Sequence, residues 1–395
     1  MPNTQIWTLP PSNADDYNHA LSDFTRPDGQ SVYYVKSTIG ALHKLDTLGK
    51  CVLQWTLSEA MTPPSAVKGE HTGAGRIALT PGRAKPRVWA TLAGWQALVE
   101  LDPVTNELRF FNATGTSGQP GYPLTGLASV LPQSPTRIWF SAYDYTLDSA
   151  VIGLLDTAAL HIDYWILGER GKDVQVRDLA LDAAGRVWFA CQTLADEGEQ
   201  VPFLGMLNPM TRGTRYWLTT GVYRMWPDRR VGCTRLGARN RLAATDIWQV
   251  TRNHNGSWVS RFDTTTLAAV AAGYVNLNEG NFAIAIDANG HANVCYEDFV
   301  RVYTATSTCL GPTIHEYVSA NARSESCAAQ VSVFKENPRT LKVPRRQVTT
   351  NAVATTCTRD LTPDNPSICD IIQAGSNKSL WLGRITGYEI GLYTP

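Results

Sequence analysis

The chain has 395 residues, of which 43% are hydrophobic and 18% charged, as expected of a folded protein with few charges. Its 35 Lys and Arg balance its 35 Asp and Glu, which excludes the strongly positive surface of proteins that bind nucleic acid or anionic membranes. No stretch approaches the roughly 18 uninterrupted apolar residues of a membrane helix, so we expect no membrane span and no nucleic-acid partner. The N-terminal residues lack the basic and apolar regions of a secretion signal, so we expect a cytoplasmic or virion-associated protein.

Taken in chain order, the sequence divides into groups of short predicted strands. A lone strand over residues 4–9 comes first. Segments such as FAIAID, which begins at Phe282, alternate apolar and polar residues, the pattern of a half-buried antiparallel strand. The groups after the lone strand cover residues 31–57, 76–112, 123–167, 176–219, 240–275, 282–318 and 369–395. Residues 319–367 lack this pattern, and we expect them to form an insertion or an extended arm.

Two neighbouring groups are copies of one another. Each contains an R-[IV]-W-F strand, an [IL]-G-x-L-[DN] strand, a short turn and a Y-W strand, once over 137–167 and again over 186–219. Trp139 and Trp188 occupy equivalent places, 49 positions apart. A period near 50 residues, built from several short strands, is the signature of a propeller blade.

The strand equivalent to R-[IV]-W-F recurs along the whole chain. It is centred on Tyr33, Trp89, Trp139, Trp188, Trp248, Cys295 and Trp381. We therefore predict an all-β, seven-bladed β-propeller with four-stranded antiparallel blades. The last group lacks a fourth strand, whereas residues 4–9 resemble the fourth strands elsewhere. We predict that residues 4–9 pair beside Tyr388 to Tyr393 and close the ring, because this pairing removes two open sheet edges.

The repeated pattern resembles the virginiamycin B lyase (streptogramin lyase) type of seven-bladed propeller. It reads Asp-x-x-Gly-x-[IV]-W-F, then I-G-x-[LI]-D and an aromatic-x-Leu strand. In that family, WFTE-type segments and a His–Glu–His set with magnesium carry an elimination that opens a cyclic ester. The matching segments here are WFSA, from Trp139 to Ala142, and WFAC, from Trp188 to Cys191, and no Glu-x-His occurs. The resemblance thus predicts the fold and assigns no catalytic residue.

The cysteines offer little support for a metal site. The eight cysteines include no CxxC pair and no Cys/His ligand spacing, so we do not expect a zinc site. Cys327, Cys357 and Cys369 lie in or near the irregular segment. A Cys357–Cys369 disulfide is one possibility and free thiols are the other. We predict no cofactor for a binding module, and a divalent metal only if the protein is an enzyme.

Loop lengths predict where binding occurs. Turns between the first and second strands, and between the third and fourth, are short, whereas the other two kinds of connection are long. Propeller topology places these long connections on one face, and long loops on a rigid scaffold commonly bind partners. The simpler interpretation is neutral drift in tolerant loops. The candidate binding residues are Tyr143, Asp144, Tyr145, Trp226, Arg229, Arg230, Glu297 and Asp298.

These observations favour a non-catalytic interaction or structural module. It would bind a protein or glycan partner through the long-loop face, as a component of a larger assembly such as a virion surface or tail. Oligomerisation or assembly would use residues 319–367. The alternative is a metal-dependent enzyme of the lyase or lactonase propeller type, with its site at the central channel. Carboxylates and histidines that converge on the channel would favour the enzyme, and exposed aromatic and Arg side chains the binding module.

Overall fold

The computed structural model describes the strands of the chain and the turns between many of them. The described residues are 3–8, 23–25, 31–36, 41–46, 52–56, 76–81, 86–92, 97–114, 124–144, 146–168, 174–193, 204–219, 236–253, 256–275, 281–286, 289–296, 299–303, 314–319, 321–335, 337, 339–341, 345–349, 358–360, 368–374, 379–384 and 389–394.

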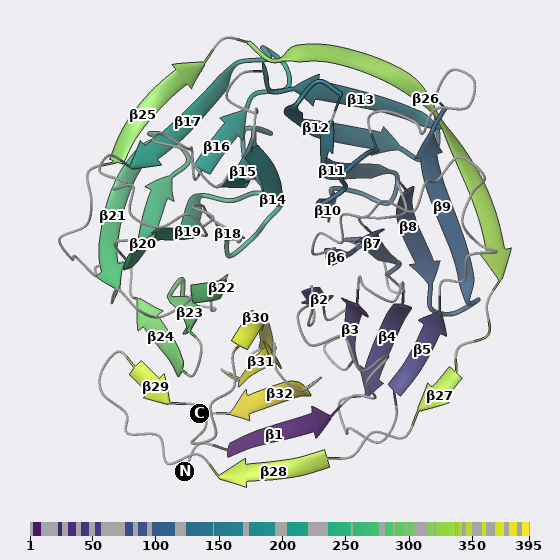
Figure 1. Ribbon diagram of the computed structural model, residues 1–395, viewed down its shortest axis with the longest axis vertical. Coiled ribbons are helices and arrows are strands. Elements are labelled where there is room, and N and C mark those ends of the chain that lie inside the picture. The colour runs from purple at the N-terminus through teal and green to yellow at the C-terminus, as the bar shows by residue number, and fades with distance from the viewer. Residues whose placement is uncertain are drawn as a thin grey trace.

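The strands stand in antiparallel blades arranged as a ring around a central axis (Figure 1). The innermost strands are β2 (Asp23–Thr25), β6 (Ile77–Leu79), β10 (Ser129–Pro132), β14 (Val174–Leu181), β18 (Leu236–Gly237), β22 (Asn281–Ile286) and β30 (Ile368–Ala374). The second strands are β3 (Ser31–Lys36), β7 (Val88–Leu92), β11 (Arg137–Asp144), β15 (Val187–Thr193), β19 (Asp246–Asn253), β23 (Ala292–Tyr296) and β31 (Ser379–Arg384). The third strands are β4 (Ala41–Asp46), β8 (Ala97–Asp102), β12 (Ser149–Asp156), β16 (Leu204–Leu207), β20 (Gly256–Asp263), β24 (Phe299–Tyr303) and β32 (Glu389–Thr394). The fourth strands are β5 (Val52–Thr56), β9 (Glu107–Ala113), β13 (His161–Ile166), β17 (Thr214–Thr219), β21 (Ala268–Val275), β29 (Thr358–Asp360) and β1 (Asn3–Thr8).

The inner strands contact one another in a closed cycle. Its order is β2, β6, β10, β14, β18, β22, β30 and back to β2. The chain therefore folds as a β-propeller, as the repeat predicts. The order agrees with seven blades, a count that stays a prediction.

The two terminal strands close the ring. β1 pairs antiparallel with β32, from Asn3 opposite Thr394 to Thr8 opposite Glu389. This confirms the predicted pairing of residues 4–9 with the C-terminal strand. The last blade thus obtains its fourth strand from the other end of the chain.

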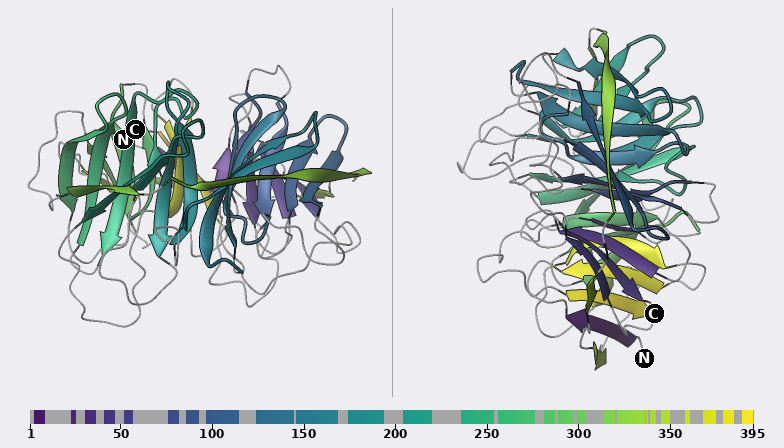
Figure 2. Two further views of the ribbon diagram at one scale, coloured as in Figure 1. Left: turned by 90° about the horizontal axis from the view of Figure 1, so that it is seen from above. Right: turned by 90° about the vertical axis from the view of Figure 1, so that its right-hand side faces the viewer.

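A belt of four further strands runs along the outside of the ring (Figures 1 and 2). The belt consists of β25 (Ile314–Ser319), β26 (Arg323–Lys335), β27 (Arg339–Leu341) and β28 (Arg345–Thr349). β25 pairs with β17, β26 first with β13 and then with β9, β27 with β5, and β28 with β1. Each belt strand covers the outer edge of a fourth strand, an edge that would otherwise present unpaired backbone groups. β28 holds β1, the ring-closing strand, on the side opposite β32.

The belt corrects one sequence expectation. Residues 314–319 were expected to form the outer strand of the 282–318 group, but they pair with β17 of another blade. The outer strand beside β24 is instead β29, with Phe299 opposite Asp360. The chain leaves this blade after its third strand, follows the rim, and returns to complete it. An outer strand and a belt strand have the same alternating pattern, so sequence alone could not separate them.

The core lies between the blades and is built from the repeated aromatic residues. Trp188 stacks on Trp217 with ring centroids 4.9 Å apart, and Trp139 stacks on Trp165 at 5.5 Å. All are buried, and such pairs contribute beyond the apolar area that they bury.

The W-F and I-G elements of the repeat form one cross-strand unit. Phe140 lies directly opposite Gly153, and Phe189 lies opposite Gly205. A Cβ atom on Gly153 would lie 2.0 Å from Phe140 Cζ, and one on Gly205 2.1 Å from Phe189 Cε2. The glycine is required because the phenyl ring lies on its Cα. This contact gives a packing reason for the motif that resembles the lyase family.

The turns between third and fourth strands share one hydrogen-bonding pattern. The side chain of the first turn residue accepts bonds from the backbone N–H groups two and three positions later, as Asp102 does from Val104 at 2.9 Å and Thr105 at 3.3 Å. Asp156, Asn208 and Asp263 repeat this arrangement. The bonds from Thr266 and Thr265 lower the pKa of Asp263. The fifth residue of each turn has positive φ and is Asn106, Leu160, Arg212 or Leu267.

Arg212 is the least suited of these four residues to its backbone conformation. Leu160 and Leu267 pack against buried clusters, and Asn tolerates the left-handed region, but Arg212 is exposed at φ 63°. We expect Arg212→Asn to raise the free energy of unfolding by about 0.5–1 kcal/mol. The reverse exchange, Asn106→Arg, should lower it by a similar amount. Urea unfolding measures both, and equal effects of one sign would contradict the explanation.

Candidate functional site

The structure places only two of the predicted binding residues. Tyr143 and Asp144 are buried, with 2% and 3% of their surface exposed. Tyr143 donates a hydrogen bond to Asp148, and Asp144 accepts bonds from the N–H groups of Thr146 at 2.7 Å and Leu147 at 3.2 Å. The expectation that Tyr143 is an exposed anchor is wrong, because both side chains organise the turn between β11 and β12.

The remaining predicted residues lie outside the described part of the chain, and their binding roles stay predictions. They are Tyr145, Trp226, Arg229, Arg230, Glu297 and Asp298. The proposed disulfide also falls there, since Cys357 and the side chain of Cys369 are not described. Of the described cysteines, Cys327 is a free thiol. Burial and, to a smaller extent, the negative charge of the nearby Asp163 raise the pKa of Cys327 to about 11.

The positions that match the glutamate of the lyase motif lie inside the core. Ala142 is 1% exposed and Cys191 is fully buried. The preceding Ser141 donates its hydroxyl hydrogen to the Val176 carbonyl oxygen at 2.7 Å. Within the described ranges, no group of three His, Cys, Asp or Glu side chains is placed to hold a metal ion. Nor does the described part of the chain contain a helix long and apolar enough to cross a membrane.

Glu100, whose pKa is shifted, has a structural role in the blade and lies outside the cavity described below. Burial raises the pKa of Glu100, while Arg87 and Arg109 act in the opposite direction. These two arginines lie 3.3 Å and 2.8 Å from Glu100 Oε2. Glu100 and Arg109 face one another across β8 and β9, so this group ties neighbouring strands together.

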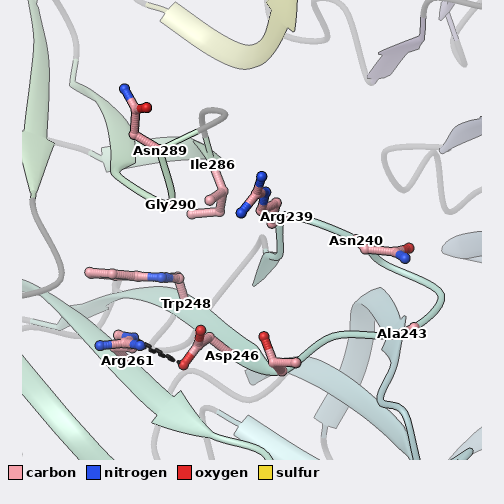
Figure 3. Close-up of a pocket in the computed structure, with 10 residues that line it drawn as sticks. Arg239, Asn240, Ala243, Asp246, Trp248, Arg261, Ile286, Asn289 and Gly290 are labelled. Carbon is pink, nitrogen blue, oxygen red and sulfur yellow. Dashed lines mark hydrogen bonds and ion pairs between the residues drawn. The ribbon is translucent and has the colours of Figure 1, made fainter.

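A polar cavity of about 420 Å³ opens between two neighbouring blades (Figure 3). The connection from β18 to β19 contributes Arg239, Asn240, Ala243 and Thr245, and the connection from β22 to β23 contributes Asn289 and Gly290. Both connect first to second strands, so the cavity lies on the short-turn face. The long-loop face, on which binding was expected, is the opposite one.

The base of the cavity is formed by β19 and β20. Arg261 donates a hydrogen bond from Nε to Asp246 Oδ1 at 3.1 Å, and its Nη2 forms an ion pair with the same oxygen at 2.8 Å. The Arg261 guanidinium also lies 5.9 Å from the centroid of the Trp248 ring. In Figure 3 these side chains lie on one side of the cavity, with Arg239, Ile286 and Gly290 on the other.

A buried ion pair positions the loop that carries Arg239. Arg241, two residues later, donates to both oxygens of Asp178 at 2.5 and 2.8 Å. Asp178 is 2% exposed and also accepts bonds from the N–H groups of Leu236 and Leu179, each at 2.9 Å. Since Asp178 belongs to β14, the neighbouring blade holds this loop in place.

Trp248 differs from the equivalent tryptophans in its hydrogen bonding. The indole N–H of Trp89 donates to Thr80 Oγ1 at 3.2 Å, and that of Trp139 to Gln133 Oε1 at 3.1 Å. The indole N–H of Trp188 donates to Asp182 Oδ2 at 2.9 Å. That of Trp248, a side chain only 4% exposed, makes no hydrogen bond with the described residues.

The reason lies in the loop before Trp248. Gln133 and Asp182 stand six positions before their tryptophans, and the residue six before Trp248 is Leu242. The nearby Asn240 uses its side-chain oxygen to accept a bond from the Leu242 N–H at 3.0 Å. Aligning Trp139, Trp188 and Trp248 places Leu242 where the first two have the acceptors Gln133 and Asp182. The acceptor of Trp89, Thr80, stands nine positions before it, so this signal covers only part of the repeats.

Comparisons with known proteins agree with the fold. The structure is similar to virginiamycin B lyase from Staphylococcus aureus, with a TM-score of 0.55 and 12% identity over 100% of both chains. The chain has a β-propeller fold. A streptogramin B lyase matches equally well, at TM-score 0.55 and 12% identity over 99% of this chain and 98% of that one.

A propeller of a different kind matches almost as closely. The Cps50 (Swd1) propeller domain of Myceliophteria thermophila has a TM-score of 0.51 and 9% identity over 98% of both chains. No protein-family model matches the chain, and no curated protein matches its sequence. At these identities the similarity concerns the fold alone, which both enzymes and non-enzymes share.

Proposed function

We propose that this protein is a non-catalytic β-propeller binding module of a larger assembly, with a glycan or protein partner. The observation that carries the proposal is the polar cavity between β18–β19 and β22–β23, whose wall includes the Trp248 indole N–H, a donor that makes no hydrogen bond with the described residues. Such a donor is available to a ligand that supplies an acceptor. The rigid ring and its belt suit a scaffold that holds such a site in one geometry.

Two further observations support binding over catalysis. The positions matched to the lyase glutamate are the buried Ala142 and Cys191. The cavity offers guanidinium, amide, indole and carboxylate groups and the Thr245 hydroxyl, but no Ser, Cys or Lys, and no His in its lining that could act as a base for Thr245. An assembly contact through residues 319–367 would use the outer edge of the belt, because its inner edge is already paired with the blades.

The test combines a binding screen with a lyase assay. The purified full chain is applied to glycan and peptide arrays, and separately incubated with a cyclic ester antibiotic of the virginiamycin B type and magnesium. We expect saturable binding to an array component and recovery of the intact cyclic compound. Metal-dependent ring opening, detected by chromatography, would overturn the proposal in favour of a lyase. An absence of binding on both arrays would also contradict it.

A further inference from the structure

The groups that line the cavity define what kind of ligand it accepts. Trp248 Nε1–H and the Arg239 guanidinium are donors only. The Arg239 side chain is exposed and, like the Trp248 indole N–H, has no hydrogen-bond partner among the described residues. In the view of Figure 3, the nitrogen-bearing ring of Trp248 is the end of the indole nearer Arg239. Acceptors are therefore required from the ligand on this side.

The charge of the cavity favours an anion. Arg261 is neutralised by Asp246, at 2.8 Å. Arg239 then leaves one positive charge uncompensated among the lining residues that Figure 3 draws. Arg binds carboxylates through two parallel hydrogen bonds, and a single uncompensated positive charge suits a ligand with a single negative charge.

The wall formed by β19 and β20 presents an acceptor, Asp246, and therefore requires a donor from the ligand. The Arg261 hydrogen bond and the ion-pair contact both involve Asp246 Oδ1, and Asp246 Oδ2 accepts no hydrogen bond from the described residues. A free carboxylate oxygen needs a neutral donor, such as a hydroxyl group, because a second anionic group would be repelled there. A volume of about 420 Å³ lies within the range of small-ligand sites, roughly 300–1,000 Å³.

We propose that the cavity between the β18–β19 and β22–β23 connections binds an acidic sugar. Its carboxylate accepts hydrogen bonds from Arg239 and Trp248, and a hydroxyl donates to Asp246 Oδ2. The inference rests on the proposed binding function and specifies its ligand class. It also places the site on the short-turn face, away from the residues that the sequence suggested.

The experiment is calorimetric titration of the full chain with methyl glucuronoside, methyl glucoside and acetate. We expect the glucuronoside to bind roughly tenfold more tightly than either comparator, equivalent to about 1.4 kcal/mol, since only it has both the carboxylate and the hydroxyls. Arg239→Met should make the glucuronoside and the glucoside bind alike. Trp248→Phe, which removes the N–H and keeps an aromatic ring, should weaken the glucuronoside several-fold.

Matched controls separate the site from general effects. Arg137→Met removes an exposed arginine at the start of β11, and Trp139→Phe removes an indole N–H that is already bonded to Gln133. Neither should change the affinity for the glucuronoside. Equal affinity of the wild-type chain for all three ligands, or unchanged affinity in Arg239→Met, would overturn the inference. If the glucuronoside fails while an array component binds, the cavity assignment is wrong and the binding module stands.

Discussion

A chain without the belt is expected to keep its blades and lose much of its stability. β24 and β29 already pair antiparallel, with Arg301 opposite Thr358, so Asn-Gly inserted between Tyr303 and Thr358 leaves a hairpin loop of Val302, Tyr303, Asn and Gly, a common loop length. The deletion exposes the outer edges of β17, β13, β9, β5 and β1. Because each lost backbone pairing contributes about 0.5–1.5 kcal/mol net, we expect unfolding to require at least about 5 kcal/mol less.

Urea unfolding followed by circular dichroism measures the difference, and light scattering detects association through the new edges. The control carries Val318→Thr and Val333→Thr, which change two exposed belt side chains and leave the backbone pairing intact. This control should stay within about 0.5 kcal/mol of the natural chain. Equal stability of the deletion and the natural chain would show that the belt does not hold the ring together.

The second large effect is expected from Asp178→Ala. The substitution removes the acceptor of four hydrogen bonds and leaves Arg241 without its bidentate partner. Breaking a buried ion pair costs about 3–5 kcal/mol, and we expect a value near 3 kcal/mol because the Arg241 side chain is 36% exposed and water can partly solvate it. The loop that carries Arg239 should also lose its anchor.

The Asp178→Ala variant should therefore show both a lower stability and a weaker binding of the sugar. Thermal unfolding reports the lost stability, and titration with methyl glucuronoside below the unfolding transition reports the displaced loop. Asp163→Ala is the matched control, since that carboxylate is 51% exposed and, among the described residues, its side chain is hydrogen-bonded only to His161. A loss of stability with unchanged affinity would show that the loop keeps its position without Asp178.

The blades could be predicted from the sequence because their determinants are local. The tryptophan strand, the glycine opposite Phe140 and the Asp-led turns each depend on residues close together in the chain. The closure of the ring was also predictable. The last group of strands lacks one member, and residues 4–9 have the pattern of that member.

The candidate site depends on contacts that no local pattern records. Trp248 looks like any other tryptophan of the repeat until the loop before it is placed, and Arg239 becomes a ligand candidate only because Ile286 and Gly290 of the next blade lie opposite. Tyr143 shows the opposite case. It lies outside the repeat pattern and was predicted to bind a partner, but its side chain is buried.

The sequence by itself determined the β-propeller class, the second and third strands of each group and the terminal strand that closes the ring. The tertiary structure alone decided that β25, β26, β27 and β28 form a belt, that β29 completes a blade begun before residue 304, and that a polar cavity opens on the short-turn face. The physical reason is that periodicity records which side of a strand is buried, and not which edge it pairs with. Edge pairing and cavities between blades arise from contacts between residues far apart in the chain, which only the assembled ring brings together.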